Sequence, residues 1–438
     1  MSRLQHFGWF LSRGFGPHGW ARDYREWNWD WTRPDLYQQS IRELERAGFD
    51  LVIIEDALSL GNPSTLDLRV REAYGAPKHD PLLLAPYLFD ATERIGVAVT
   101  TNPLAYHPYT AARQFATLGH LSGHRFGANV VTDVGSSRHF GVDPLPHDRA
   151  YDRAQEWLDG IRSLWSSWRP GALVRDAATD RFADGSLLDA VQHRGEFYRF
   201  DGPLNALPAD DDPFIVSPGG SPRGIAFAGA NSDVQLALAS FDLGKLRGYR
   251  ERVREQAVLH GRDPDHVKTL IVFKPTIVGS PEEARRLVDA SQHPDDAALL
   301  AVAKAWSSDS ETDLTALDLD RPLDPGVFGD HVSQGTIKGL LGGSEFGDGT
   351  PLRELLARKA RLGRVADRTG VVGTADEIAD FIEELGAEAD NDGLIFSGDL
   401  HPVTIHRTLD DLVPILRRRG ILRDDLGTGG TRANLRDF

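Results

Sequence analysis

Short runs of apolar and β-branched residues recur along the chain, and amphipathic segments separate them. The segment Asp35 to Gly48 shows the helical period clearly, because Leu36, Ile41, Leu44 and Ala47 form one stripe opposite charged residues. The runs expected to be strands are His6 to Leu11, Leu51 to Glu55, Ile95 to Thr100, Phe126 to Thr132, Pro213 to Ser217, Val234 to Ser240, Thr269 to Ile277 and Gly393 to Ser397. Strands that alternate with helices in this way predict an α/β fold with a parallel sheet. Eight such pairs indicate a (β/α)8 TIM barrel, formed as one domain over residues 1–438.

Three connections are too long to be simple loops, and they follow strands 1, 4 and 7. The second covers about 169–212 and contains the expected hairpin HRGEFYRF, and the third covers about 307–350. Within the third, Gly335 to Gly349 holds six glycines in fifteen residues, which predicts mobility. This stretch is interpreted either as a lid that orders over a ligand or as a disordered surface loop.

The composition of the chain excludes several kinds of binding partner and catalytic chemistry. The 438-residue chain carries 49 Lys and Arg against 65 Asp and Glu, a net charge of −16, which argues against nucleic acid and anionic membranes as partners. It has no cysteine, so disulfides and thiolate catalysis are excluded. No apolar run reaches the roughly 18 residues needed to span a bilayer, so a soluble cytoplasmic protein with a small-molecule partner is expected.

A helix that follows strand 4 begins with a histidine and a tyrosine. His147 and Tyr151 lead the stripe that continues through Ala154, Leu158 and Ile161 toward the barrel. One interpretation makes both rings core residues with satisfied polar tips. The other places an anion there, because a helix that follows a strand starts at the catalytic face with its N–H groups free.

The turn after strand 5 has the features of a second anion site. In the stretch from Ser217 to Gly224, Gly219 and Gly220 allow a ligand to approach the backbone, and Ser221 is a natural N-cap before Pro222. An ordinary helix start explains the same residues. Two such starts on one barrel face favour a phosphate site, which is frequent late in this fold.

Short polar side chains end the neighbouring strands. The sequence VIIEDA ends strand 2 with Glu55 and Asp56, and strands 3 and 4 contribute five more residues. These five are Thr100, Thr101, Asn102, Asn129 and Thr132. Each of them could simply cap a loop, but together they indicate a flat polar ligand held by its edge.

Five tryptophans gather in and around the loop after strand 1 and are expected to line a pocket or to form a subunit contact: Trp9, Trp20, Trp27, Trp29 and Trp31. His18 lies in the same loop and is a candidate for contact with the substrate. No metal-binding motif is found: the two histidines of HPVTIH are spaced by five residues and do not share a helix face.

Longer stretches match a known family. The chain resembles the flavin-dependent monooxygenases of the bacterial luciferase-like superfamily, specifically the group that oxidises nitrilotriacetate, dibenzothiophene sulfone and dimethyl sulfide. The match covers nearly the whole chain and includes LERAGFDLVIIEDA, HDRAYDRAQEWLDGIRSLWSSW and GGSPRGIAFAGANSDVQLA.

The resemblance implies a barrel that binds FMN, which arrives reduced (FMNH2) from a separate NAD(P)H:flavin reductase. Reduced FMN and O2 would form a C4a-(hydro)peroxyflavin that transfers one oxygen atom to a small organic substrate. It further implies a homodimer or homotetramer. The residues implied at the flavin are Asp56 at the isoalloxazine end, Thr100 and Asn102 along the ring edge, Asn129 near the ribityl chain, and His147, Tyr151 and Ser221 around the phosphate. His18 and His79 are candidates for proton transfer.

Three positions depart from the family pattern, namely Ala128, Asp133 and the Asp80–Pro81 pair. An acidic group at position 133 is expected to disfavour an anionic substrate. Two alternatives are also considered: a deazaflavin (F420)-dependent oxidoreductase of the same fold, and a barrel that binds flavin without catalysis.

Overall fold

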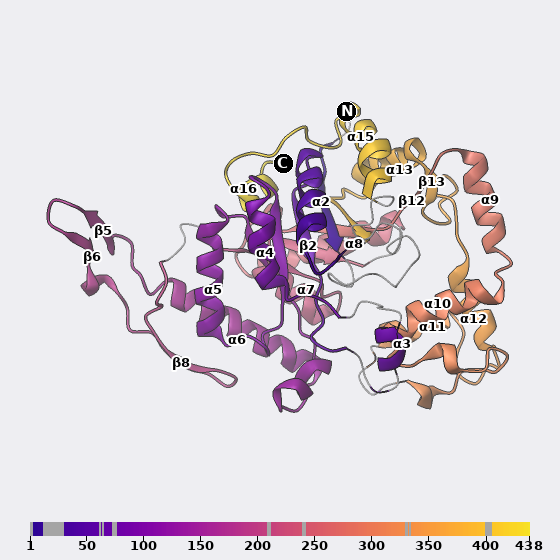
Figure 1. Cartoon of the computed structure of the whole chain (residues 1–438), viewed down its shortest axis with the longest axis horizontal. Coiled ribbons are helices and arrows are strands. Elements are labelled where there is room, and N and C mark those ends of the chain that lie inside the picture. Colours follow the sequence, from indigo (N-terminus) through magenta and orange to yellow (C-terminus); the bar gives the residue numbers. More distant parts are fainter. Residues whose placement is uncertain are drawn as a thin grey trace.

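The structure is a closed barrel of eight parallel strands surrounded by helices (Figure 1). It is a computed structural model and describes residues 3–11, 30–60, 63, 65–71, 77–207, 212–238, 242–328, 332, 334–398 and 405–438. The order of the strands around the barrel is β1-β14-β11-β10-β9-β4-β3-β2. The predicted TIM barrel is therefore confirmed.

Each barrel strand coincides with one of the predicted apolar runs. The strands are β1 (His6–Leu11), β2 (Leu51–Ile54), β3 (Gly96–Thr101), β4 (Phe126–Val130), β9 (Phe214–Ser217), β10 (Val234–Ala237), β11 (Lys268–Phe273) and β14 (Gly393–Gly398). The seventh run was predicted too long. It divides at Pro275 into β11 and a separate strand, β12 (Thr276–Val278), which pairs with β13 (Val372–Thr374) outside the barrel. Proline lacks the N–H that a barrel strand must donate, so β11 ends before it.

Helices follow the strands and pack on the outside of the barrel. They are α2 (Asp35–Arg46), α4 (Pro81–Asp90), α5 (Pro108–Leu121), α6 (His147–Trp165), α7 (Pro222–Asn231), α8 (Leu243–Leu259), α13 (Ala375–Glu388) and α15 (Val413–Arg418). Two shorter helices are α3 (Leu66–Arg71), between β2 and α4, and the C-terminal α16 (Thr431–Leu435). Two apolar layers result from the alternation of side chains along each strand. On β2, Leu51 and Ile53 belong to the barrel interior, whereas Val52 and Ile54 pack against the surrounding helices.

The C-terminal segment closes the end of the barrel where the strands begin. Leu435 of α16 joins the interior apolar cluster, and the ring of Phe438 stacks on His6 with centroids 4.2 Å apart. The two ends of the chain consequently lie close together (Figure 1).

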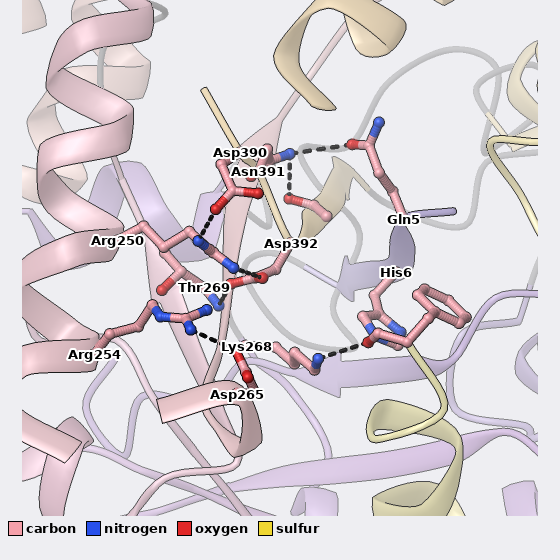
Figure 2. Close-up of polar contacts among 12 residues, drawn as sticks. Gln5, His6, Arg250, Arg254, Asp265, Lys268, Thr269, Asp390, Asn391 and Asp392 are labelled. Atoms are coloured by element: carbon pink, nitrogen blue, oxygen red, sulfur yellow. Dashed lines mark hydrogen bonds and ion pairs between the residues drawn. The ribbon is translucent and has the colours of Figure 1, made fainter. Parts of the chain in front are cut away.

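Buried aspartates stand directly before three of the barrel strands at this end. The carboxylates of Asp50, Asp233 and Asp392 accept backbone N–H groups of Phe7, Ile215 and Thr269, respectively, at 2.8–2.9 Å. Each of them also pairs with an arginine, as Figure 2 shows for Arg250, which reaches Asp392 at 2.8 Å and also contacts Asp390. These pairs join neighbouring strands and stabilise the end of the barrel where the strands begin.

The connection between α6 and β9 forms two antiparallel hairpins. They consist of β5 (Leu173–Asp176) with β6 (Arg181–Ala183), and β7 (Gln192–Arg194) with β8 (Arg199–Asp201). The second is the hairpin predicted from HRGEFYRF. The β5–β6 hairpin projects far from the barrel (Figure 1).

The connection between β11 and α13 builds a small helical layer on the opposite side of the molecule (Figure 1). Its helices are α9 (Pro281–Ser291), α10 (Asp296–Asp309), α11 (Gln334–Leu341) and α12 (Leu352–Ala360). The prediction of a loop from Gly335 onward was wrong for residues 335–341, which are helical. Leu340 and Leu341 of α11 pack with apolar residues of α10 and α12, and this burial outweighs the low helix propensity of glycine.

Several predicted features fall on residues outside those the structure describes. They are His18 and the tryptophans Trp20, Trp27 and Trp29. Within the described ranges, no helix combines the length and apolar character needed to cross a membrane.

Candidate active site

Polar side chains of β3 and β4 meet where these strands end. The Asn129 amide donates a 2.8 Å hydrogen bond to the Thr100 hydroxyl, and both residues are almost completely buried. The Asn129 carbonyl oxygen, Oδ1, is also buried and has no hydrogen-bond partner among the described residues. A buried acceptor without a donor is costly, so this atom is positioned to receive an N–H or O–H group of a ligand.

Asn102 organises the loop that follows β3. Its amide donates to the Asp133 carbonyl at 2.8 Å, and its Oδ1 accepts the N–H of Leu104 at 3.0 Å. The Asp133 carboxylate accepts hydrogen bonds from Gly135 N and Ser136 Oγ in its own loop. These two bonds hold the carboxylate within its own loop, and the expectation that Asp133 disfavours an anionic substrate stays a prediction.

The two helix starts predicted to bind an anion lie side by side. Nε2 of His147, at the start of α6, is 3.4 Å from Oγ of Ser221, the N-cap of α7. Ser221 accepts the N–H of Gly224 at 3.1 Å, and Pro222 occupies the first helical position, as predicted. The N-terminal N–H groups and dipoles of both helices are thus brought to one location on the barrel rim.

The glycine turn is packed tightly against Tyr151. A Cβ atom on Gly219 would lie 2.2 Å from the Tyr151 hydroxyl and 2.8 Å from Cα of Gly224. At Gly220, by contrast, the nearest atom to an added Cβ would be the Tyr249 hydroxyl at 3.9 Å. Only glycine fits at position 219, whereas position 220 faces open space.

Tyr151 itself is a buried phenol. Burial raises its pKa, and the neighbouring Thr132 and Ser221 hydroxyls and the Arg223 charge oppose this rise. The phenol therefore remains a neutral hydrogen-bond donor near pH 7. Arg223 is held by a 2.9 Å bond to Asp152 on α6, which locks α6 to α7.

A group of ionisable residues lies beyond the ends of β2 and β3. Burial raises the pKa of Asp56 to about 6, the Lys78 ammonium lowers it, and Glu55 and Asp80 raise it further. Lys78 pairs with Glu55 at 3.0 Å, and the Asp80 carboxylate accepts the N–H groups of Leu82 and Leu83 at the start of α4. Asp56 is consequently a carboxyl group that changes protonation close to neutral pH.

His79 lines a cavity of about 350 Å³ between the starts of α2 and α4. Its ring lies 5.2 Å from the ring of Trp31. The other residues around this cavity are Thr32, Arg33, Pro34, Asp80, Leu83, Leu84 and Tyr87. In the part of the chain that the structure describes, no three His, Asp or Glu residues are grouped as a metal site.

Sequence reasoning missed two residues that hold this site together. The buried amide of Gln235 donates to the Gly219 carbonyl at 2.9 Å and to the Tyr249 hydroxyl at 2.8 Å. The Tyr106 hydroxyl bonds to Asp80, and burial followed by the charge of Asp80 raises the pKa of this phenol. The polar residue within the apolar run VQLALA was the available signal for Gln235.

Comparison with known proteins identifies the class of enzyme that this barrel represents. The model of the luciferase-like monooxygenase family matches residues 6–389, and the chain belongs to this family. It is a flavin-dependent monooxygenase built on the barrel described above.

Individual relatives align over nearly the full length. The chain is 31% identical over 439 residues to a dibenzothiophene-sulfone monooxygenase of Rhodococcus erythropolis (strain XP), covering 97% of this chain and 94% of that protein. It is 28% identical to nitrilotriacetate monooxygenase component A of Aminobacter aminovorans, with coverages of 92% and 91%. A crystal structure of riboflavin lyase with modified FMN and riboflavin superposes with a TM-score of 0.81 at 26% identity, covering 100% of this chain and 96% of that one.

The residues present fit an FMN molecule. The ring and ribityl groups require donors and acceptors along the strand ends, where the Asn129 Oδ1 atom has no partner in the described structure. The phosphate requires N–H groups beside a space free of Cβ atoms, and the turn offers such a space at Gly220. Both requirements are met on the same rim of the barrel.

Proposed function

We propose that this chain is the oxygenase component of a two-component system that uses reduced FMN, supplied by a separate NAD(P)H:flavin reductase. Its reaction inserts one atom of O2 into a small organic substrate, and the other atom leaves as water. The contact between His147 and Ser221 supports this proposal most directly, because it joins two helix starts beside the unpartnered Asn129 Oδ1.

The phosphate of FMN is assigned to the Gly219–Gly220 turn and the start of α7 that follows it. His147, Tyr151 and Ser221 surround this point and can each donate a hydrogen bond to a phosphate oxygen. The Gln235 bond to the Gly219 carbonyl keeps the turn in place, so that the N–H groups are oriented before the ligand arrives.

The flavin ring is assigned to the ends of β2, β3 and β4. Asn129 offers an acceptor to the ribityl chain, Thr100 and Asn102 lie along the ring edge, and Asp56 stands at the far end of the ring. Reduced FMN, when bound, supplies the electrons with which O2 is activated. The protein must hold this group in a dry pocket, since water diverts the reaction to hydrogen peroxide.

Asp56 and His79 are the described residues best placed to hold or move a proton near the substrate. With a pKa of about 6, Asp56 is a mixture of both protonation states around neutral pH and can either donate or accept a proton. His79 lies in the neighbouring cavity, next to Asp80. His18 remains a further candidate, although it is outside the described residues.

The relatives support the assignment to a two-component system. One of them is named component A of nitrilotriacetate monooxygenase, and another acts on dibenzothiophene sulfone. We infer a substrate that is a small sulfide, sulfone, amine or ketone.

The test is oxygen transfer by the purified chain with reduced FMN under 18O2. A panel of small sulfides, sulfones, amines and ketones should yield one product that carries a single 18O atom, together with oxygen uptake that depends on that substrate. Reduced deazaflavin should support no oxygen uptake. Hydride transfer with the deazaflavin and no 18O incorporation with FMN would contradict the proposal.

A further inference from the structure

A second cavity lies at the opposite end of the barrel from the predicted flavin site. Its volume is about 390 Å³, within the usual range of small-molecule sites, and it is lined by residues of α6, the end of α7, the start of β9 and the α16 segment. Its lining residues are Leu158, Arg162, Trp165, Asp212, Pro213, Ile215, Asn231, Asp233, Arg262, Arg432 and Arg436.

Four arginines and two aspartates line this cavity, which leaves an excess of two positive charges. Such an excess is unusual for a chain whose overall net charge is −16. The arginines come from three separate parts of the sequence, so the fold has brought like charges together. A cluster of this kind attracts anions and is stabilised by them.

The arginines differ in how far their donors are already used. Arg432 is fully engaged by Asp233 and by the carbonyls of Asp212 and Pro213, at 2.7–3.1 Å. Arg262 donates to backbone carbonyls at the end of α7. These two residues build the wall of the cavity.

Arg162 and Arg436 retain free donors. Within the described residues, Arg162 makes one hydrogen bond, to Asn231 Oδ1 at 2.7 Å, and a 3.8 Å ion pair with Asp159. Arg436 contacts Asp233 at 3.7 Å, which is too long for a hydrogen bond. Since a guanidinium carries five N–H donors, both side chains can bind a further anion.

Burial shapes the electrostatics of the cluster. It lowers the pKa of Arg162 and of Arg262, and the charge of Arg432 lowers both further, whereas Asp233 opposes the change. Both guanidinium groups nevertheless stay charged at neutral pH. An anion in the cavity would offset the repulsion between these arginines.

We propose that this cavity is a second ligand site, which binds a small organic phosphate through Arg162 and Arg436. Phosphate suits the planar guanidinium forks, which bind its oxygens in pairs. The cavity is larger than a phosphate group, and Leu158, Trp165 and Pro213 offer apolar surface for the organic part. Because Arg436 follows α16 and Arg162 lies on α6, the ligand also ties the C-terminal closure of the barrel to its wall.

The experiment is calorimetric titration of the full chain with phenyl phosphate and with inorganic phosphate, at an ionic strength matched with sodium chloride. We expect phenyl phosphate to bind more tightly than inorganic phosphate. The double variant Arg162→Gln/Arg436→Gln should lose about a hundredfold in affinity or more, since two charged hydrogen-bond donors are removed. Arg436→Glu, a change at a side chain that is 39% exposed and makes no hydrogen bond among the described residues, should lower the affinity without affecting folding.

Two controls separate this cavity from other anion sites. Arg285→Gln, at an exposed arginine on α9 whose described partner is Glu282, should leave the affinity unchanged. His147→Ala/Tyr151→Phe removes phosphate-binding residues of the predicted flavin site, and the affinity of this cavity at the other end of the barrel should remain as it is in the parent chain. Affinity that survives Arg162→Gln/Arg436→Gln, or that is lost with His147→Ala/Tyr151→Phe, would overturn the proposal. If inorganic phosphate bound as tightly as phenyl phosphate, the proposal that the cavity recognises the organic part of the ligand would be overturned.

Discussion

The amide of Gln235 donates a 2.9 Å hydrogen bond to the carbonyl oxygen of Gly219, and so connects β10 to the turn that precedes α7. The same side chain bonds Tyr249 and, through its oxygen, Ser217. One fully buried side chain therefore sets the geometry of the turn assigned to the FMN phosphate.

Gln235→Leu should weaken the binding of FMN and lower the free energy of unfolding by about 1–3 kcal/mol, because it leaves buried polar partners unsatisfied. Fluorescence titration with FMN and urea unfolding measure the two effects. Gln39→Leu, at an exposed glutamine of α2 that bonds only Glu43 among the described residues, is the matched control. Equal effects of the two substitutions would show that Gln235 has no special role.

Gly219→Ala should reduce FMN affinity and stability together, since the added methyl group would lie 2.2 Å from the Tyr151 hydroxyl and force the turn to shift. Relief of such an overlap costs on the order of 1–3 kcal/mol. Gly220→Ala in the same turn should leave stability unchanged, because its methyl group meets only open space. Thermal unfolding of both variants makes the comparison, and identical melting temperatures would refute this account of the turn.

His147→Ala together with Tyr151→Phe should weaken the binding of FMN by about 1–3 kcal/mol, the usual loss for hydrogen bonds to a charged group. Riboflavin lacks the phosphate, so its affinity should change little. His260→Ala, at an exposed histidine at the end of α8, serves as the control. If the two ligands lost affinity equally, the substitutions would not act through contacts with the phosphate.

The pH dependence of stability should contain a contribution from Asp56. Its folded-state pKa of about 6 lies above the ordinary aspartate pKa of 3.8, so the folded protein binds more protons than the unfolded chain between these pH values. This group therefore lowers stability as pH rises from about 4 to about 6, by on the order of 2 kcal/mol.

Asp56→Asn should remove that contribution, and the variant should gain stability relative to the parent chain as pH rises through this window. Urea unfolding at pH 4 and pH 7 provides the measurement. Asp80→Asn is not a suitable control, because Asp80 caps α4. Asp90→Asn, at the end of α4, should instead leave the pH profile unchanged. If the free energies of unfolding of Asp56→Asn and the parent chain differed by the same amount at both pH values, the raised pKa would be contradicted.

Asp392→Ala should destabilise the chain by about 3–5 kcal/mol, because it leaves the buried Arg250 without its buried partner and Thr269 N without an acceptor. Asp390→Ala also removes a carboxylate that pairs with Arg250 (Figure 2). The Asp390 side chain is 51% exposed, so its loss should change the free energy of unfolding little. Urea denaturation of the two variants tests the difference. Similar losses for both would show that burial does not govern the strength of these pairs.

Local sequence patterns were sufficient to predict much of the fold. Each of the eight predicted runs became a barrel strand because parallel strands covered on both faces must be apolar, which makes them visible in the sequence. The start of α7 was equally predictable, since Ser221 and Pro222 have strong local preferences for the N-cap and first helical positions. The error at Gly335 arose where burial against α10 and α12 outweighed local propensity.

The sequence indicated which residue types form the candidate site, but only the fold shows how these residues lie relative to one another. The sequence by itself determined the barrel, the helix starts and the polar strand ends, because short-range periodicity and backbone preferences encode them. Only the tertiary structure decided that His147 meets Ser221, that Gln235 holds the Gly219 carbonyl and that Asp133 caps its own loop. It also gathered four arginines from three distant segments around one cavity. Such long-range contacts depend on how strands and helices pack rather than on the order of neighbouring residues.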